Sequence, residues 1–312
     1  MYLPPAEIDL LRSAKVDMSS YELIDSGHFR KLERFGNVVL DRPCAQAVWK
    51  PKLKQEKWQG AAAKFLRKSG GQGRWQIQSK SFPASWKVDI HGLNVLIKLT
   101  EFGHVGIFPE HHDAPLLEKV MATEVEQRGS FKLLNLFAYT GVVSLLGARS
   151  GAHVTHIDAS KTSVSWAREN AALSGLEDCP VRWIVEDVGR FVGRAVSRGD
   201  RYDGIVLDPP SFGRGPKGDV WKIEDHLLDL LDQLKVLASE NFAFIKLSAH
   251  SQGYTPVALE NLLRDLFPVG DYSHHSREMI IRPNSSSPVL PAGASALCLS
   301  KKIEQAIGSR DW

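Results

Sequence analysis

The sequence contains little cysteine and no long hydrophobic run. Cys44, Cys179 and Cys298 are the three cysteines among 312 residues, and neither their number nor their spacing is typical of a disulfide framework or a metal site. No apolar run reaches the roughly 20 residues that span a bilayer. Residues 1–15 carry charges throughout, unlike a signal peptide. These absences predict a soluble protein of the cytoplasm.

The glycine pattern of a dinucleotide site is also missing. Residues 131–141, FKLLNLFAYTG, are an apolar run that ends in a Thr-Gly turn, and residues 142–149 suit a helix. This order predicts a buried parallel strand, a loop and a helix, the unit at which open α/β folds bind nucleotide-like ligands. A pyrophosphate would require G-x-G-x-x-G there. The loop instead consists of Asn135, Leu136, Phe137, Ala138, Tyr139, Thr140 and Gly141. It suits a ligand without a phosphate at that point.

Strand and helix patterns alternate from residue 131 to the end of the chain. Strands are expected at 131–137, 152–158, 181–187, 203–208 and 242–248, followed by a strand pair at 271–283 and 294–301. Ser160 and Thr255 are expected helix N-caps. Alternating β and α elements predict a Rossmann-like α/β fold with a mostly parallel, doubly wound sheet.

The N-terminal third has a different pattern. Short apolar pieces broken by glycine and proline between residues 21 and 49 predict strands joined by tight turns, and residues 74–100 predict a hairpin. Short helices are expected at 6–12 and within 50–68. We therefore expect a small antiparallel β module in residues 1–105 and a larger domain in residues 106–312.

The small module carries most of the positive charge. Residues 30–87 contain 14 lysines and arginines against three acidic residues, a local charge of +11 in a chain whose total is +3. Aromatic residues are interleaved with them: Phe35, Trp49, Trp58, Phe65, Trp75, Phe82 and Trp86. One interpretation is an RNA-binding surface, in which cations neutralise phosphates and aromatic rings stack on unpaired bases. The other is that the aromatic residues form the core of the module.

Acidic residues end the second, third and fourth strands of the larger domain. Asp158 lies 23 positions after Asn135, where a carboxylate can accept hydrogen bonds from both hydroxyls of a ribose. Asp187 and Asp208 end the next two strands. Such acids also serve as helix caps. Together with the loop at 135–141 they predict an adenosine pocket.

Four segments in this order carry a resemblance to a known family: NLFAYTG at 135–141, HVTHIDAS at 153–160, WIVEDV at 183–188 and DPPSFGRG at 208–215. They resemble the class I S-adenosylmethionine-dependent methyltransferases. Within these, the chain is similar to the ribosomal RNA large-subunit methyltransferases, which act on cytosine C5 or guanine N7. The resemblance covers roughly residues 105 to 300. It implies a seven-stranded sheet with an antiparallel last strand and S-adenosylmethionine (SAM) as the cofactor.

The resemblance also implies which residues bind the cofactor. It assigns the adenine amine to Asp187, with the backbone N–H of Val188 beside it, and it places Phe108 near the cofactor. The implied set is residues 135–141 as named above, Asp158, Ala159, Asp187, Val188 and Asp208.

Asp208, Pro209, Pro210 and Phe212, in the segment DPPSF, are the expected catalytic residues. Two prolines remove two N–H donors, so the carbonyls around Asp208 are expected to point outward as acceptors for the N–H groups of a base rotated out of its stack. Phe212 would stack on that base, although Ser211 separates it from the prolines. A plain turn is the alternative interpretation.

The acceptor atom is expected to be a nitrogen. Methylation of cytosine C5 requires a thiolate, and the related enzymes that perform it carry a cysteine just after the fifth strand, whereas residues 246–251, KLSAHS, contain none. A metal is not expected, because His111 and His112 lack further ligands at a zinc spacing. The basic loop at 213–218 either contacts phosphate or is an ordinary surface loop.

The sequence therefore predicts a SAM-dependent methyltransferase that acts on a base of RNA, in particular ribosomal RNA. Two alternatives remain open: methylation of a protein or small molecule by the same fold, and an RNA-binding protein with a vestigial cofactor pocket. The sequence does not indicate an oligomeric state.

Overall fold

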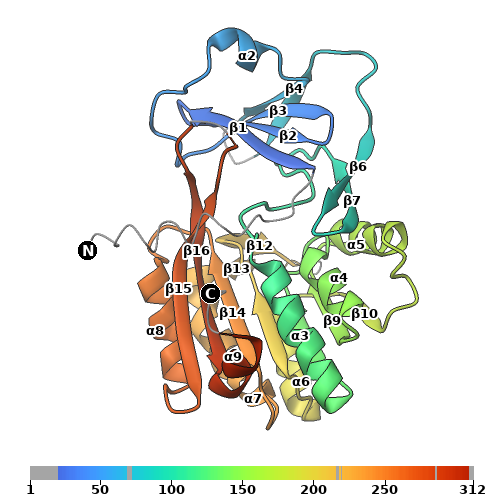
Figure 1. The fold of residues 1–312 in the computed structure, drawn as a ribbon, viewed down its shortest axis with the longest axis vertical. Coiled ribbons are helices and arrows are strands. Elements are labelled where there is room, and N and C mark those ends of the chain that lie inside the picture. The colour runs from blue at the N-terminus through green and yellow to red at the C-terminus, as the bar shows by residue number, and fades with distance from the viewer. Residues whose placement is uncertain (1–19, 69–71, 216–217, 219, 285–286, 309–312) are drawn as a thin grey trace.

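A small β-rich layer lies over one end of a larger α/β body (Figure 1). The structure, a computed structural model, describes residues 20–68, 72–215, 218, 220–284 and 287–308. The helix expected at 6–12 lies outside these ranges, as do residues 216 and 217 of the basic loop. No helix within the described ranges is long and apolar enough to cross a membrane.

The body is built around a seven-stranded sheet of order β10-β9-β8-β11-β14-β16-β15. Its strands are β8 (Lys132–Leu136), β9 (His153–Asp158), β10 (Val181–Val185), β11 (Gly204–Leu207), β14 (Phe244–Ala249), β15 (Tyr272–Ile281) and β16 (Leu290–Ser300). Strand β16 runs antiparallel to both of its neighbours, and the other pairings are parallel. The expected doubly wound sheet with an antiparallel last strand is confirmed.

Helices cover both faces of this sheet. They are α3 (Ala114–Arg128), α4 (Val142–Arg149), α5 (Lys161–Leu173), α6 (Val188–Arg198), α7 (Ile223–Leu237), α8 (Pro256–Leu266) and α9 (Lys301–Ile307). Because successive side chains of a strand point to opposite faces, Leu133 and Val206 pack with α3 and α9, whereas Leu134 and Ile205 pack with α6, α7 and α8. The continuous apolar strands seen in the sequence follow from this two-sided burial.

Two helix starts follow the sequence prediction. The Ser160 hydroxyl accepts the N–H of Ser163 at 3.1 Å. The Thr255 hydroxyl accepts the N–H of Ala258 at 3.3 Å, directly before Pro256. Each side chain satisfies a backbone donor that the first turn of a helix leaves without an intrahelical partner.

The small layer contains a five-stranded sheet and a separate hairpin. The sheet consists of β1 (Tyr21–Gly27), β2 (Arg30–Phe35), β3 (Val38–Pro43), β4 (Ala63–Arg67) and β5 (Gly73–Ile77), with α2 (Gln55–Gln59) between β3 and β4. The hairpin consists of β6 (Ser85–Ile90) and β7 (Leu93–Lys98). All sheet pairings are antiparallel except β3–β4, which is parallel. The expected antiparallel module is therefore found, with one parallel pairing because α2 carries the chain back across the sheet.

Most of the aromatic residues singled out in this layer belong to its packed interior. Phe35 and Phe65 are fully buried. The indole N–H of Trp75 donates to the Thr100 carbonyl at 2.8 Å, and that of Trp86 donates to the Phe35 carbonyl at 2.9 Å. These hydrogen bonds fix the rings against the layer. For these residues the core interpretation holds.

The two layers share hydrophobic contacts and a polar anchor. One hydrophobic cluster joins Val95 and Ile97 of the β6–β7 hairpin to Leu145 of helix α4. On the other side, Asp25 of β1 is fully buried and accepts a hydrogen bond from the Ser287 hydroxyl, which lies between β15 and β16. The small layer is therefore attached to the body at two places that are far apart in the sequence.

Candidate active site

A cavity of about 730 Å³ opens between the two layers at the carboxyl ends of the parallel strands. Every cofactor residue expected from the sequence lines it, from Asn135 to Gly141 and on to Asp158, Ala159, Asp187, Val188 and Asp208. Pro209 and Pro210 line it as well. The strand ends converge because β10, β9, β8 and β11 are neighbours in the sheet. This edge is where open α/β sheets bind ligands.

The loop after β8 is tightly wound. Phe137 and Tyr139 have φ values of 54° and 49°, and Gly141 has a φ of 87° as the N-cap of α4. Left-handed conformations are uncommon for residues other than glycine, so contacts must hold them. The Tyr139 N–H donates to the Asp158 carboxylate at 2.8 Å, and the Thr140 hydroxyl donates to the Gly106 carbonyl at 2.5 Å.

Asp158 and Asp187 stand in different environments. The Asp158 carboxylate accepts backbone N–H bonds from Tyr139 and Ser160, both at 2.8 Å, and burial raises its pKa above the usual value. The Asp187 carboxylate caps helix α6 by accepting the Arg190 N–H at 3.0 Å. Asp187 therefore caps helix α6, as expected of an acid at a strand end, and it also lines the cavity.

A buried hydrogen-bond chain lies beneath the loop. The Asn135 amide donates to the Ser144 hydroxyl at 2.9 Å, and Ser144 lies 2.9 Å from Nδ1 of His156. Since Ser144 accepts from Asn135, its own proton is available to His156. Burial lowers the pKa of His156 to about 3, which agrees with a neutral ring. These hydrogen bonds join β8, α4 and β9 beneath the cavity.

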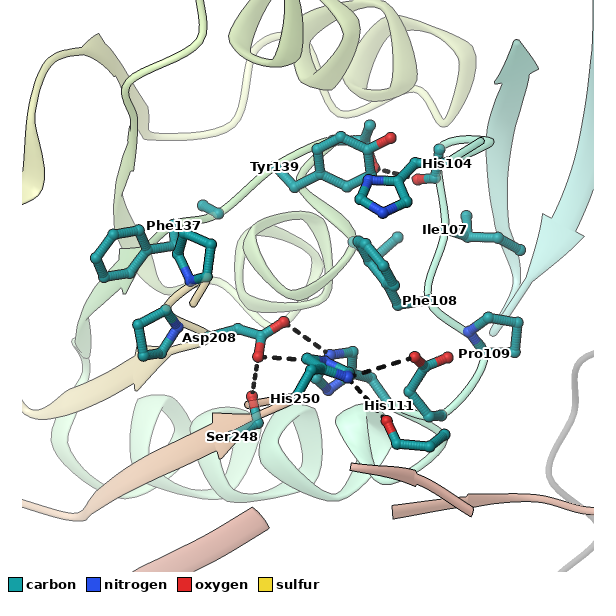
Figure 2. A pocket seen from close by; sticks show the side chains of 18 of the residues that line it. His104, Ile107, Phe108, Pro109, His111, Phe137, Tyr139, Asp208, Ser248 and His250 are labelled. Atoms are coloured by element: carbon teal, nitrogen blue, oxygen red, sulfur yellow. Dashed lines mark hydrogen bonds and ion pairs between the residues drawn. The ribbon is translucent and has the colours of Figure 1, made fainter. Parts of the chain in front are cut away.

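Asp208 is held by three side chains from distant segments. Its Oδ2 lies 3.2 Å from Nε2 of His111, and its Oδ1 accepts the Ser248 hydroxyl at 2.7 Å and lies 3.5 Å from Nε2 of His250. Figure 2 shows these side chains pointing toward one another. Burial alone would raise the pKa of Asp208, but the two histidines outweigh it and hold that pKa well below its usual value. Asp208 is therefore an anion at neutral pH.

His250 lies between two acidic groups. Its Nδ1 is 2.8 Å from the Ala292 carbonyl and 3.9 Å from Oε1 of Glu110, while Nε2 faces Asp208. Burial disfavours its charge, yet these acceptors together raise the pKa of His250 to about 9. Both ring nitrogens face acceptors, so the protonated form satisfies the site best. The ring supplies a positive charge beside Asp208.

Aromatic rings form one wall of the cavity. Phe108 lies 5.3 Å from His104, 5.4 Å from Tyr139 and 6.0 Å from His250, measured between ring centroids. Figure 2 shows Phe108 between the His104–Tyr139 pair and the two histidines at Asp208. Burial lowers the pKa of His104 to about 4, so it is neutral at pH 7. The wall therefore presents the flat faces of aromatic rings from His104 toward Asp208.

Comparison with solved structures identifies the family to which the chain belongs. A SAM-dependent methyltransferase from Agrobacterium tumefaciens is 37% identical to the chain and superposes with a TM-score of 0.83, over 90% of both chains. The chain belongs to the SAM-dependent methyltransferases. The structure of SMU.776 in complex with SAH, 17% identical with a TM-score of 0.69, shares the fold. SAM is accordingly the cofactor of this methyltransferase.

Curated relatives cover only part of this methyltransferase. The ribosomal RNA large subunit methyltransferase K of Neisseria meningitidis serogroup B is 30% identical over 189 residues, which are 60% of the chain and 50% of that relative. The methyltransferase K/L of Pseudoalteromonas atlantica is 29% identical over 241 residues, 74% of the chain and 31% of the relative. The chain thus spans half or less of the length of these two proteins. No model of a protein family matches it.

Phe212 does not take the place expected for it in this methyltransferase. Phe212 belongs to β12 (Phe212–Arg214), which pairs with β13 (Val220–Lys222), and it is 53% exposed. Its neighbours Ser211 and Gly213 line the cavity, whereas Phe212 does not. Since side chains alternate along a strand, Phe212 points away from the cavity, and stacking on a substrate base there is not supported.

One of the expected backbone acceptors is also occupied. The Pro210 carbonyl accepts the indole N–H of Trp221 at 2.7 Å, which ties β13 to the DPPSF turn. The Pro210 carbonyl therefore has one of its two lone pairs engaged within the protein, and the role expected for the carbonyls around Asp208 stays a prediction.

The sequence interpretation missed the two histidines. The sequence pattern raises His111 only as a possible metal ligand, and it assigns no role to His250. In the described part of the chain, possible ligand atoms of His111, Asp208 and His250 all lie within 4.8 Å of one another. The prediction of no metal rested on spacing along the chain and stays a prediction. A signal was present for His250, which directly follows β14, the neighbour of β11 in the sheet, whereas His111 precedes helix α3 and meets Asp208 only in the folded chain.

Proposed function

We propose that this methyltransferase transfers the methyl group of SAM to a base of ribosomal RNA, at a nitrogen atom. The observation that carries the proposal is the aromatic wall, from His104 through Phe108 to His250, that leads to the Asp208-Pro209-Pro210 turn. A base rotated out of its stack is flat and needs such faces together with hydrogen-bond acceptors at its edge. The relatives named as ribosomal RNA methyltransferases support the choice of RNA.

We further propose a division of labour between the layers. Residues 1–105, with the local excess of positive charge, would contact RNA, and residues 106–312 would hold the cofactor and the reacting base. Since the β6–β7 hairpin packs on helices α4 and α5, the first part is an attached layer rather than a tethered domain.

The cavity residues fit SAM in shape and in chemistry. The Asp158 carboxylate is fixed by two backbone donors and retains lone pairs for ribose hydroxyls. Asp187 and Val188 would recognise the adenine, and the loop from Asn135 to Gly141 would enclose the amino acid part. A volume of about 730 Å³ holds the cofactor together with one base. When bound, SAM supplies an electrophilic methyl group on sulfur.

The protein's own residues would align the acceptor. Because the Pro210 carbonyl is occupied by Trp221, the Asp208 and Pro209 carbonyls are the acceptors proposed for the N–H groups of the base. The Asp208 side chain already receives three donors, so it holds the turn in place. Alignment of this kind can supply much of the rate of an in-line displacement.

The cysteines support a nitrogen acceptor over cytosine C5. Cys44 lines the cavity, on the side of the small layer. Its thiol lies 3.5 Å from Oε1 of Gln46, and burial raises its pKa. Cys298 is buried, and its pKa is raised to about 12. A C5 mechanism needs a thiolate, and neither thiol is poised to become one.

The proposal can be tested on ribosomal RNA from cells that lack the gene. The purified methyltransferase is incubated with SAM and this RNA, and the products are digested and mapped by mass spectrometry. We expect one additional methyl group on the base of one nucleotide, absent when the Asp158→Ala variant is used. Methyl transfer to protein but not to RNA would contradict the proposal, as would a methyl group on carbon.

A further inference from the structure

The small layer presents an aromatic side chain that the core does not use. Phe102 is 47% exposed and lines the mouth of the cavity. Phe29 and Phe212 are the other phenylalanines among the exposed large hydrophobic residues of the described ranges, and neither lines the cavity. Exposure forgoes the stabilisation that burying such a ring would provide. The ring of Phe102 is therefore accessible at the edge of the cavity.

The backbone holds Phe102 outward in a fixed turn. The Gly103 N–H donates to the Thr100 carbonyl at 3.1 Å, and Gly103 has a φ of 81°. A Cβ atom on Gly103 would lie 2.9 Å from the buried Phe65 ring. The turn is thus pressed against the core of the small sheet while Phe102 faces the cavity mouth. A backbone fixed in this way loses little conformational entropy when the side chain that it carries binds a ligand.

An arginine lies next to this turn. Arg67 ends β4 opposite Gly73, whose N–H donates to the Glu101 carbonyl at 2.8 Å, so β4 and the turn are neighbours. Arg67 also lines the cavity. Unlike Arg42, which pairs with Glu33 at 2.7 Å, Arg67 makes no ion pair with a described residue. Its charge is available to a ligand at the mouth.

We propose that Phe102 and Arg67 form a subsite for single-stranded RNA beside the cavity. The inference rests on the proposed function: when one base enters the cavity, the adjacent nucleotide remains at the mouth. Phe102 stacks on the base of that nucleotide, and Arg67 contacts its phosphate. Glu101, exposed beside Phe102, repels phosphate and directs the backbone toward Arg67.

Two matched controls separate this subsite from general effects. Ile77 has the same exposed fraction as Phe102, 47%, and lies in β5 of the same layer, outside the cavity. Lys57 is an exposed cation on α2 that also lies outside the cavity. The variants are Phe102→Ala, Phe102→Trp and Arg67→Gln, compared with Ile77→Ala and Lys57→Gln. SAM binding and melting temperature are measured for each variant.

The experiment is a titration of a fluorescein-labelled single-stranded RNA of mixed sequence at several salt concentrations. We expect Phe102→Ala to weaken binding roughly tenfold, as for loss of one stacked base, while Phe102→Trp binds as the wild type does or more tightly. Arg67→Gln should lower the slope of log Kd against log salt by about 0.7, the value of one phosphate contact on a single strand. The two controls should behave as the wild type.

The outcomes distinguish this inference from the proposed function. If the wild type binds and methylates RNA but Phe102→Ala and Ile77→Ala bind it equally well, the subsite is wrong and the proposed function stands. If the wild type binds SAM but neither this RNA nor ribosomal RNA, both are wrong. A loss of SAM affinity in Phe102→Ala would assign the ring to the cofactor instead and would also overturn the subsite.

Discussion

The imidazole of His111 lies 3.2 Å from the carboxylate of Asp208, although 97 positions separate the two residues. Together with Ser248 and His250, His111 uses three of the lone-pair directions of that carboxylate. The side chain of Asp208 is therefore an internal anchor for the turn that follows β11. The position of the Pro209–Pro210 backbone depends on it.

Replacing His111 by glutamine should lower methyl transfer more than cofactor binding. The amide does not reproduce the contact of the imidazole with Asp208, so the carboxylate loses one of its three partners and the turn loses its alignment. Small misplacements of a reacting group can cost about 10²-fold in rate. We expect kcat to fall by about that factor while the Kd for SAM, measured by calorimetry, changes little. His112→Gln is the control; equal losses in both variants would contradict an anchoring role.

The charge of His250 should appear in the pH dependence of stability. Its folded pKa, about 9, is above the ordinary histidine value of about 6.5. A raised pKa means that the contribution to stability is full below pH 6.5 and is lost as pH rises toward 9. Urea unfolding of the wild type and His250→Gln should therefore differ most near pH 6 and converge above pH 9. A constant difference over this range would show that His250 does not titrate as described.

Asp158 should control cofactor affinity. Its carboxylate accepts two backbone N–H groups at 2.8 Å and faces the cavity. A hydrogen bond to a charged group contributes about 1.5–3 kcal/mol, so Asp158→Asn should weaken SAM binding by about 10- to 100-fold in calorimetry. Asp225→Asn, an exposed acid outside the cavity, is the control. Unchanged affinity in Asp158→Asn would place the ribose elsewhere.

Gly141 and Gly175 allow backbone strain to be separated from contact. Both have positive φ values, 87° and 68°, but a Cβ on Gly141 would lie 3.0 Å from Cβ of Ala167, whereas a Cβ on Gly175 meets nothing within 4 Å. Gly175→Ala should cost about 1 kcal/mol for its left-handed backbone alone. Gly141→Ala should cost more in urea unfolding and should also weaken SAM binding. Equal losses in the free energy of unfolding of the two variants would show that helix α5 shifts to accommodate the added methyl group.

Cys44 tests the choice of acceptor atom. Its thiol has a raised pKa and lies on the wall of the cavity that the small layer contributes. Cys44→Ser should retain methyl transfer to RNA within a few-fold of the wild type, measured with radiolabelled SAM. Abolished transfer, together with a covalent complex of the wild type with 5-fluorocytosine RNA, would establish a thiolate mechanism at carbon.

The strand ends of the body could be predicted because local patterns determine them. Buried parallel strands form continuous apolar runs, and a small or acidic residue marks each carboxyl end, so Asp158, Asp187 and Asp208 were found together with the loop before Gly141. Parallel neighbours bring these ends to one edge without any long-range information beyond strand order.

The histidines and the aromatic residues were harder to predict. His250 acquires its role from Ala292 and Glu110, which reach it through the β14–β16 pairing and the segment before α3. For Trp75 and Trp86, alternation identified strands but did not tell which face a second layer would cover. Phe102 showed no periodic pattern because it lies in a turn. Whether an aromatic side chain packs in the core or stays exposed depends on contacts between segments that are distant in the sequence.

The attachment of Asp25 to Ser287 has a mechanical consequence. With this bond at one side and the hairpin on α4 at the other, the small layer is fixed to the body at two separate places. A hinge movement that opened the cavity would therefore have to break one of these two attachments.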